Sequence, residues 1–113
     1  MMTSHSHPPL RKIQEPQQIL DELVKSMTQK NVVGIFFKGE TELVTTAVVN
    51  LIQTDIDTLV QFKDTDLHGY ELDKNPVLLS DIDSVIHFET LFDEPVYANI
   101  RQRRAHVRKI VAA

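Results

Sequence analysis

The stretch PQQILDELVKSMTQKNVVGIFF, from Pro16 to Phe37, contains the change of hydrophobic pattern that decides the fold. Its first half predicts an amphipathic helix of about four turns, because apolar residues recur at one-, three- and four-residue steps. Pro16 suits the first turn of that helix, because a main-chain N–H at that position has no acceptor within the helix and its absence costs no hydrogen bond. From Val32 the residues become β-branched and aromatic, which favours a strand. The apolar stripe of the helix consists of Ile19, Leu20, Leu23, Val24 and Met27.

The remainder of the chain reads as further short strands separated by polar turns. The last strand region bends at a corner at Ser80–Asp81, and the polar connection before it has room for a short strand near Tyr70–Leu72. The strands follow one another too closely for parallel crossover connections. One helix before several short strands predicts an α+β fold, with the helix packed on a small antiparallel barrel of the split or Sm-like type. The predicted strand regions are 32–37, 43–52, 58–62 and 77–88.

The length and hydrophobic content predict one domain with a real core. The chain has 113 residues, of which 42% are hydrophobic, so wholesale disorder is not expected. We expect a flexible N-terminus at 1–12, a helix-plus-barrel domain at 13–92 and a basic C-terminal segment at 93–113. The expected core residues are Ile19, Leu23, Val24, Met27, Val33, Ile35, Phe37, Ala47, Val49, Leu59, Val60, Phe62, Leu78, Ile82, Val85 and Ile86.

The composition excludes several kinds of functional site. The chain has no cysteine, so disulfides, thiolate metal sites and cysteine nucleophiles are impossible. Its three glycines, Gly34, Gly39 and Gly69, cannot be arranged as a glycine-rich phosphate loop. No apolar run approaches the ~18 residues that cross a bilayer, and MMTSHSHPPL lacks the apolar core of a signal peptide. We therefore expect a cytoplasmic protein.

Acidic residues and serines give no sign of a catalytic centre. Three acid pairs lie at expected turns, where Asp side chains hydrogen-bond the main chain. No serine lies in a nucleophile elbow, and no nucleophile with a neighbouring base is visible. We therefore expect no enzyme activity and no cofactor. The acid pairs are Asp55/Asp57, Asp64/Asp66 and Asp81/Asp83.

The histidines also have simpler explanations than metal binding. His5 and His7 could hold a metal at two-residue spacing, but we interpret them as part of an unstructured polar end. His68 and His87 are isolated, and His87 is interpreted as a surface-facing strand residue. We expect no metal site.

Charge is distributed unevenly along the chain. The formal net charge is −4, yet residues 31–94 hold three lysines against thirteen acids, while residues 95–113 hold five bases and no acid. The tail contains QRRAHVR, from Gln102 to Arg108. On a helix Arg104 and Arg108 are neighbours, and in an extended segment they also share a face. Either way two planar guanidinium groups can converge on one anion, such as a phosphate, or grip a guanine edge.

Composition alone leaves three interpretations of this tail open. It can bind a nucleotide, it can bind nucleic acid in general, or it can be a solvated basic helix. In the last case it would dock on the acidic middle of its own or a neighbouring chain, through surface ion pairs that contribute only ~0–1 kcal/mol each. Nucleic-acid binding by the acidic middle is disfavoured, because phosphate contacts need bases at the surface.

The order of helix, strands and arginines resembles the N-terminal domain of bacterial flagellar brake proteins, which precedes a cyclic di-GMP-binding PilZ domain. The matching segments are PQQILDELVKSM, GIFFKGETELVTTAVVNL, DTLVQFKD and PVLLSDIDSVIHF, followed by QRRAHVR for the QRRxxxR junction motif. The resemblance implies a non-enzymatic regulatory domain that controls motility through protein partners such as flagellar motor components. It also implies that Arg104 and Arg108 hold cyclic di-GMP, with Arg103 assisting. Residues 93–113 would then link to a PilZ domain, which the 113 residues do not contain.

Two alternatives accompany this reading. The chain is also similar to bacterial Sm-like RNA chaperones, which place a helix before a five-stranded barrel, and QEP at 14–16 matches the start of theirs. That family implies RNA binding, although SDID stands where its basic lysine–histidine pair is expected. The second alternative is a self-associating homo-oligomer, with the basic tail of one chain on the acidic sheet of the next.

Overall fold

The computed structural model describes residues 13–112 of the protein, with side chains described as far as residue 105. Within these residues the chain folds as one helix, two small antiparallel sheets and a C-terminal helix, which confirms the predicted α+β class. His5 and His7 lie outside the described residues. The elements in chain order are α1 (Pro16–Gln29), β1 (Asn31–Phe37), β2 (Val44–Thr46), β3 (Val48–Gln53), β4 (Thr58–Phe62), β5 (Val77–Leu78), the 3-10 turn η2 (Leu79–Asp81), β6 (Ile82–Leu91) and α2 (Pro95–Ala112).

Helix α1 begins at Pro16, as predicted. The N–H of Glu15 donates to Oε1 of Gln18 at 3.1 Å, which pairs a donor at the start of the helix that has no partner within it. The helix ends where Lys30 adopts a left-handed conformation with φ 59°, a common way to stop a helix before a strand. Its buried face lies against β1, β6 and β3, so α1 joins the two sheets.

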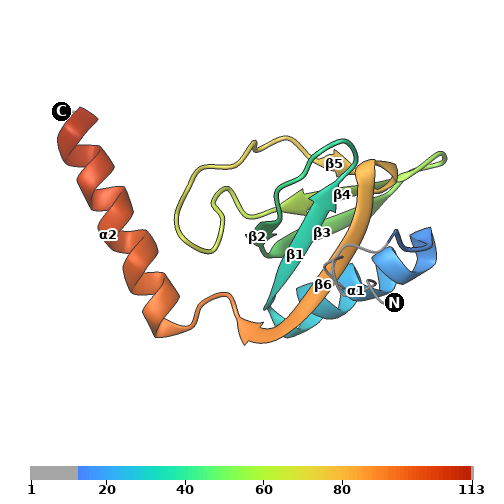
Figure 1. Ribbon diagram of the computed structural model, residues 1–113, viewed down its shortest axis with the longest axis horizontal. Coiled ribbons are helices and arrows are strands. Elements are labelled where there is room, and N and C mark those ends of the chain that lie inside the picture. The colour runs from blue at the N-terminus through green and yellow to red at the C-terminus, as the bar shows by residue number, and fades with distance from the viewer. Residues whose placement is uncertain (1–12, 113) are drawn as a thin grey trace, which may run out of the picture.

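The strands form two sheets, ordered β2-β1-β6 and β3-β4-β5, with every pairing antiparallel. In Figure 1, α1 runs beneath the strands, whereas α2 stands apart on the other side of the loop that precedes β5. The corner predicted at Ser80–Asp81 is confirmed as η2, after which β6 continues to Leu91. Near Tyr70–Leu72 there is a single bridge, from Thr65 to Glu71, rather than a strand.

The expected barrel is not closed, and the reason lies at Ala47. The stretch 43–52, predicted as one strand, divides there into β2 in the first sheet and β3 in the second. Ala47 is buried, and its carbonyl oxygen accepts from the N–H of Lys63 at 2.9 Å. The far edge of the second sheet is β5, which has only two residues. So short a strand pairs with β4 alone, and the two sheets remain separate.

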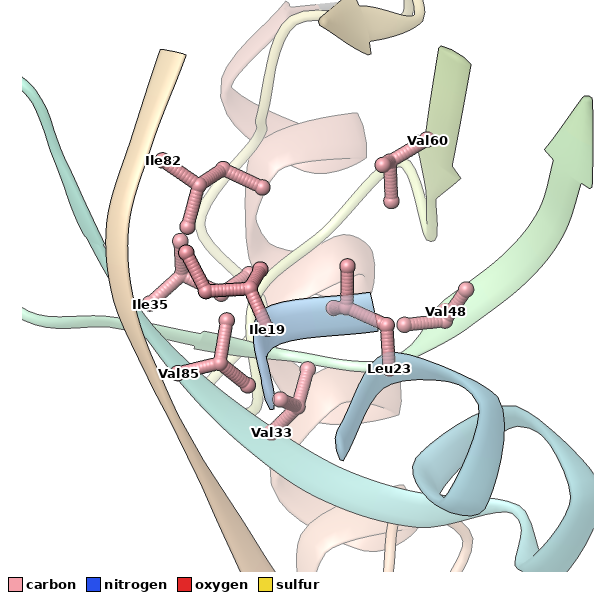
Figure 2. Packing of buried hydrophobic residues seen from close by; sticks show 8 residues of the cluster. All are labelled: Ile19, Leu23, Val33, Ile35, Val48, Val60, Ile82 and Val85. Atoms are coloured by element: carbon pink, nitrogen blue, oxygen red, sulfur yellow. The ribbon is translucent and has the colours of Figure 1, made fainter. Parts of the chain in front are cut away.

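The main core lies between α1 and the inner faces of both sheets, as Figure 2 shows. Leu23 on the helix, Val33 on β1 and Val60 on β4 are all completely buried. Burying one such side chain stabilises the fold by about 1.5–3 kcal/mol. The core residues drawn in the figure are Ile19, Leu23, Val33, Ile35, Val48, Val60, Ile82 and Val85.

A second apolar cluster connects the sheets to the C-terminal helix. It is formed by Val32, Ala47, Leu67 and Phe92, with Phe88 and Tyr97 packed against it. Four of these six positions come from the loop after β4 or from the end of β6 and beyond. This cluster therefore holds the first turn of α2, through Tyr97, against the sheets and the loop after β4.

Of the sixteen predicted core residues, eight are buried, five are partly buried and three are exposed, so the last three are wrong. Val24, Val49 and Leu78 are 42%, 49% and 40% exposed. Val24 lies at the edge of the helical stripe, and Val49 lies at an irregularity in the pairing of β3 with β4. Leu78 on β5 is paired directly with Leu59 on β4, so the two side chains lie on the same face of the sheet. At Leu78 that face is exposed. Predicted core positions that are only partly buried are Met27, Phe37, Leu59, Phe62 and Ile86. Buried hydrophobic residues missing from the prediction are Val32, Phe36, Val48, Leu67 and Phe92.

Candidate functional site

The arginine motif lies on α2, so the helical interpretation of the tail is the correct one. The helix starts at Pro95, and the carbonyl oxygen of Glu94 accepts from the N–H groups of Tyr97 and Ala98 at 3.0 and 2.9 Å. On a helix Arg101 and Arg104 are three residues apart and lie on one face. That face meets the loop between β4 and β5, whereas the side chain of Arg103 is exposed.

The tip of this loop is built by Asp66. Its Oδ1 accepts from the main-chain N–H groups of His68 and Tyr70, both at 2.9 Å. Its own N–H donates to the carbonyl oxygen of Tyr70 at 2.9 Å. The carboxylate thus closes a tight turn over residues 66–70, which confirms the turn interpretation of this acid. The N–H of Leu67 donates to Thr45 at 2.8 Å, which ties the turn to β2.

Arg104 attaches α2 to the tip of this loop. Its Nε donates to the carbonyl oxygen of His68 at 2.7 Å, and its guanidinium carbon lies 4.2 Å from the centre of the Tyr70 ring. We call these two contacts the Arg104 clasp. Among the described residues no carboxylate forms an ion pair with Arg104. The arginine is therefore held by a main-chain dipole and an aromatic face, neither of which cancels its charge.

Arg101 makes a different set of contacts. One terminal nitrogen donates to the carbonyl oxygen of Leu67 at 3.2 Å, and the other pairs with Asp93 at 3.1 Å. Its guanidinium also lies over the ring of Phe92, 3.9 Å from the centre. Arg101 is thus neutralised by a carboxylate and committed to the base of α2. Helical spacing already predicts that Arg101 shares a face with Arg104 and Arg108. The sequence gives no sign, however, that Asp93 pairs with Arg101.

Gly69 allows the close approach of the loop and the helix. Its φ is +94°, a conformation that L-residues with side chains rarely adopt. A Cβ added there would lie 3.2 Å from both Cα of Arg101 and Cδ of Arg104. The stem of Arg104 thus runs directly over this glycine toward Tyr70. The arrangement needs glycine for its backbone and for its lack of a side chain.

The remaining predicted ligand residues are placed by the helix alone. Arg108 follows Arg104 by four positions on α2, which puts their Cα atoms one turn apart. Its side chain lies outside the described residues. Arg103 is exposed and points away from the loop-facing side. The structure thus shows the contacts of Arg104 and the exposure of Arg103, whereas Arg108 is placed by its backbone alone.

Asp57, from the first of the acid pairs, serves the fold. Oδ2 of Asp57 accepts from the Ser80 hydroxyl at 2.7 Å, and Oδ1 accepts from the N–H of Thr58 at 2.7 Å. These bonds, that of Ser80 first, hold the pKa of the Asp57 carboxyl below its usual value, because they stabilise the charged form. Asp57 therefore joins the β3–β4 turn to η2. No group of three or more potential metal ligands occurs within the described part of the chain.

His87 is not surface-facing, contrary to the sequence interpretation. It is half-buried on β6, and its Nε2 lies 2.9 Å from Nδ2 of Asn31, which is itself buried. The bulge between Asn31 and Val33 in the β1–β6 pairing brings the two side chains together. His68, by contrast, is exposed, and its ring lies 6.4 Å from that of Tyr97 in an edge-on arrangement.

Comparison with protein-family models, with curated proteins and with solved structures found no match to this chain. Among the described residues, no helix has the length and apolar character needed to cross a membrane.

Proposed function

We propose that this chain is a non-enzymatic regulatory domain of a cyclic di-GMP-responsive protein of the flagellar brake type. The observation that carries the proposal is the state of Arg104. Its guanidinium is anchored to the domain by His68 and Tyr70 but has no carboxylate partner among the described residues. A positive charge is thus presented at a defined place beside the loop.

The chemistry of arginine suits this ligand. Guanidinium stays charged at any physiological pH and offers parallel N–H donors that grip a phosphate or the O6/N7 edge of guanine. Cyclic di-GMP carries two phosphates and two guanines, so one ligand offers several such partners. Arg104 and Arg108, one helical turn apart, form the proposed gripping pair, with Arg103 as an auxiliary cation. Arg101 is excluded from the ligand set, because Asp93 already neutralises it.

The proposed output is a change in how the domain docks on a protein partner, such as a component of the flagellar motor, in the cytoplasm. A ligand can change docking only if it binds one arrangement of α2 more tightly than another. Helix α2 is suited to this, because its first turns rest on a loop while the rest continues past the sheets (Figure 1). The affected element would be the attachment of α2 to the domain.

Calorimetry tests the proposal. Cyclic di-GMP is titrated into this chain and into the protein extended through any sequence that follows residue 113 in its reading frame. The expected result is saturable binding that is lost in Arg104→Ala combined with Arg108→Ala. Lys25→Ala is the matched control, since this exposed lysine on α1 forms an ion pair with Glu22 at 3.3 Å and with no other residue that the structure describes. An extended protein that does not bind, or binding unchanged in the double variant, would refute the assignment.

Two other outcomes would point to the alternatives. Tight, salt-sensitive binding of oligo(A) or oligo(U) in a filter assay, with a ring-shaped oligomer by light scattering, would favour the Sm-like interpretation. A change of oligomeric state on deletion of residues 95–113, without any effect of cyclic di-GMP, would favour self-association.

A further inference from the structure

The guanidinium of Arg104 is proposed as a ligand anchor, yet it is already engaged. Nε donates to the main chain of His68, and one face of the guanidinium plane covers the ring of Tyr70. We infer that the Arg104 clasp and the ligand compete for this side chain, so that ligand binding releases residues 68–70 of the turn from Arg104. This inference rests on the proposed function and adds its regulation.

The competition follows from the geometry of guanidinium. The group has two edges that grip an anion with paired N–H donors, one formed by the two terminal nitrogens and one that includes Nε. The clasp occupies Nε and one stacking face. A ligand that uses the Nε edge, or that stacks a base on the covered face, must first open the clasp.

The direction of the side chain adds a second conflict. The stem of Arg104 crosses Gly69, so its head group is directed onto the loop. An anion shared with Arg108 lies instead along α2, one turn beyond Arg104. To reach it, the guanidinium has to leave the ring of Tyr70. The open state is therefore the state that binds the ligand.

The consequence is local. Arg101 keeps its bonds to Leu67 and Asp93, so the base of α2 stays attached when the clasp opens. The Asp66 carboxylate continues to hold the turn itself. What changes is the contact of Arg104 with the turn, which uncovers the face of the Tyr70 ring for a protein partner. The clasp thus couples occupancy of the arginines to the exposure of one aromatic ring.

Because only open molecules bind, the apparent affinity for the ligand equals the affinity of the open state multiplied by the fraction of molecules that are open. Weakening the clasp without touching the arginines should therefore tighten ligand binding. Tyr70→Ala does this, because it removes the ring under Arg104 but leaves every cation in place. We expect binding about 3- to 10-fold tighter, as for a clasp that is closed in most molecules. Tyr70→Phe is the matched control, since it keeps the ring.

The test has two arms. The first, without ligand, measures amide hydrogen exchange of residues 66–72 in the wild type, in Arg104→Ala and in Arg103→Ala. We expect faster exchange at Tyr70 and its neighbours in Arg104→Ala only, because the bonds to Asp66 remain but break more often once Arg104 no longer holds the turn. Equal exchange in all three proteins overturns the clasp, whatever the ligand does.

The second arm titrates cyclic di-GMP into the wild type, Tyr70→Ala and Tyr70→Phe. Tighter binding by Tyr70→Ala alone supports competition. Unchanged binding means that the ligand uses only the free edge of Arg104, and weaker binding means that it stacks on Tyr70; either result overturns the inference while the proposed function stands. No binding by any of the three refutes the proposed function and, with it, the coupling, even if the first arm shows that the clasp exists.

Discussion

The guanidinium carbon of Arg104 lies 4.2 Å from the centre of the Tyr70 ring, and its Nε donates to the neighbouring carbonyl oxygen of His68 at 2.7 Å. The contact joins the basic end of the chain to a turn within its acidic middle without using an acid. Arg101 beside it uses Asp93 instead. Two arginines on one helical face thus have different roles, since one is neutralised and the other keeps its charge.

Replacing Arg104 should cost measurable stability. Arg104→Ala removes a hydrogen bond from a charged donor and a partly exposed cation–π contact, so we expect the free energy of unfolding to fall by about 1 kcal/mol. Arg103→Ala removes the same charge from an exposed position and should stay within ~0.5 kcal/mol of the wild type. Urea unfolding followed by circular dichroism measures both. Equal losses would mean that the clasp contributes nothing to folding.

A side chain at Gly69 should disturb the packing of α2. Gly69→Ala forces alanine into φ +94° and places its Cβ 3.2 Å from Cα of Arg101. We expect a loss of about 2 kcal/mol or more, of which ~1 kcal/mol is the cost of positive φ. Gly39→Ala is the control, because φ is +80° there and no atom lies within 4 Å of the added Cβ. If Gly39→Ala destabilises as much as Gly69→Ala, the helix is not packed on the loop as described.

Adjacent positions on α1 should respond very differently to truncation. Leu23 is completely buried, so Leu23→Ala should destabilise by about 2–5 kcal/mol through lost burial and a residual cavity. Val24 is 42% exposed, and Val24→Ala should cost less than ~1 kcal/mol. Thermal or urea unfolding of the two variants decides which side of the helix faces the sheets. A larger loss for Val24→Ala would contradict the orientation of α1.

Acid should weaken the connection between the β3–β4 turn and η2. The folded-state pKa of Asp57 is lowered by the hydrogen bond from Ser80 and the N–H of Thr58. Because the pKa is lower when folded, the stabilisation is fully present above the unfolded pKa of 3.8 and is lost as the pH falls through the folded value. Ser80→Ala should raise the Asp57 pKa in a carboxyl-detected NMR titration and flatten the stability profile below about pH 4. A pKa that does not move in Ser80→Ala would remove the hydroxyl as its cause.

Much of the fold could be predicted because local patterns and tertiary structure agree. The stripe of α1, the strand at 58–62 and the corner at Ser80–Asp81 all appear as expected. The closed barrel does not, because the division at Ala47 depends on a bond from Lys63, which follows β4 in the chain. Hydrophobic spacing within 43–52 contains no information about that partner. Spacing also predicts a core position for Val49 and for Leu78, yet both are exposed, because strand pairing decides which face each side chain takes.

The candidate site was predictable only in part. The motif and the helical spacing of Arg104 and Arg108 can be read from the sequence, as can the turn-forming role of Asp66. The contact of Arg104 with Tyr70 cannot, because it depends on how a polar loop folds back across Gly69. The neutralisation of Arg101 by Asp93 likewise depends on the angle at which α2 leaves β6. These contacts separate a structural arginine from a proposed ligand residue.

The most direct test of the account observes the Nε–H group of Arg104 itself. In an NMR spectrum of arginine side chains, its signal is assigned by comparison with Arg104→Ala and followed while cyclic di-GMP is added. The account predicts a saturable shift of this signal, as the bond to His68 is exchanged for one to the ligand, with the Arg101 signal nearly unchanged. If the Arg104 signal does not move at any concentration of cyclic di-GMP, including concentrations at which the ligand binds, the account is contradicted.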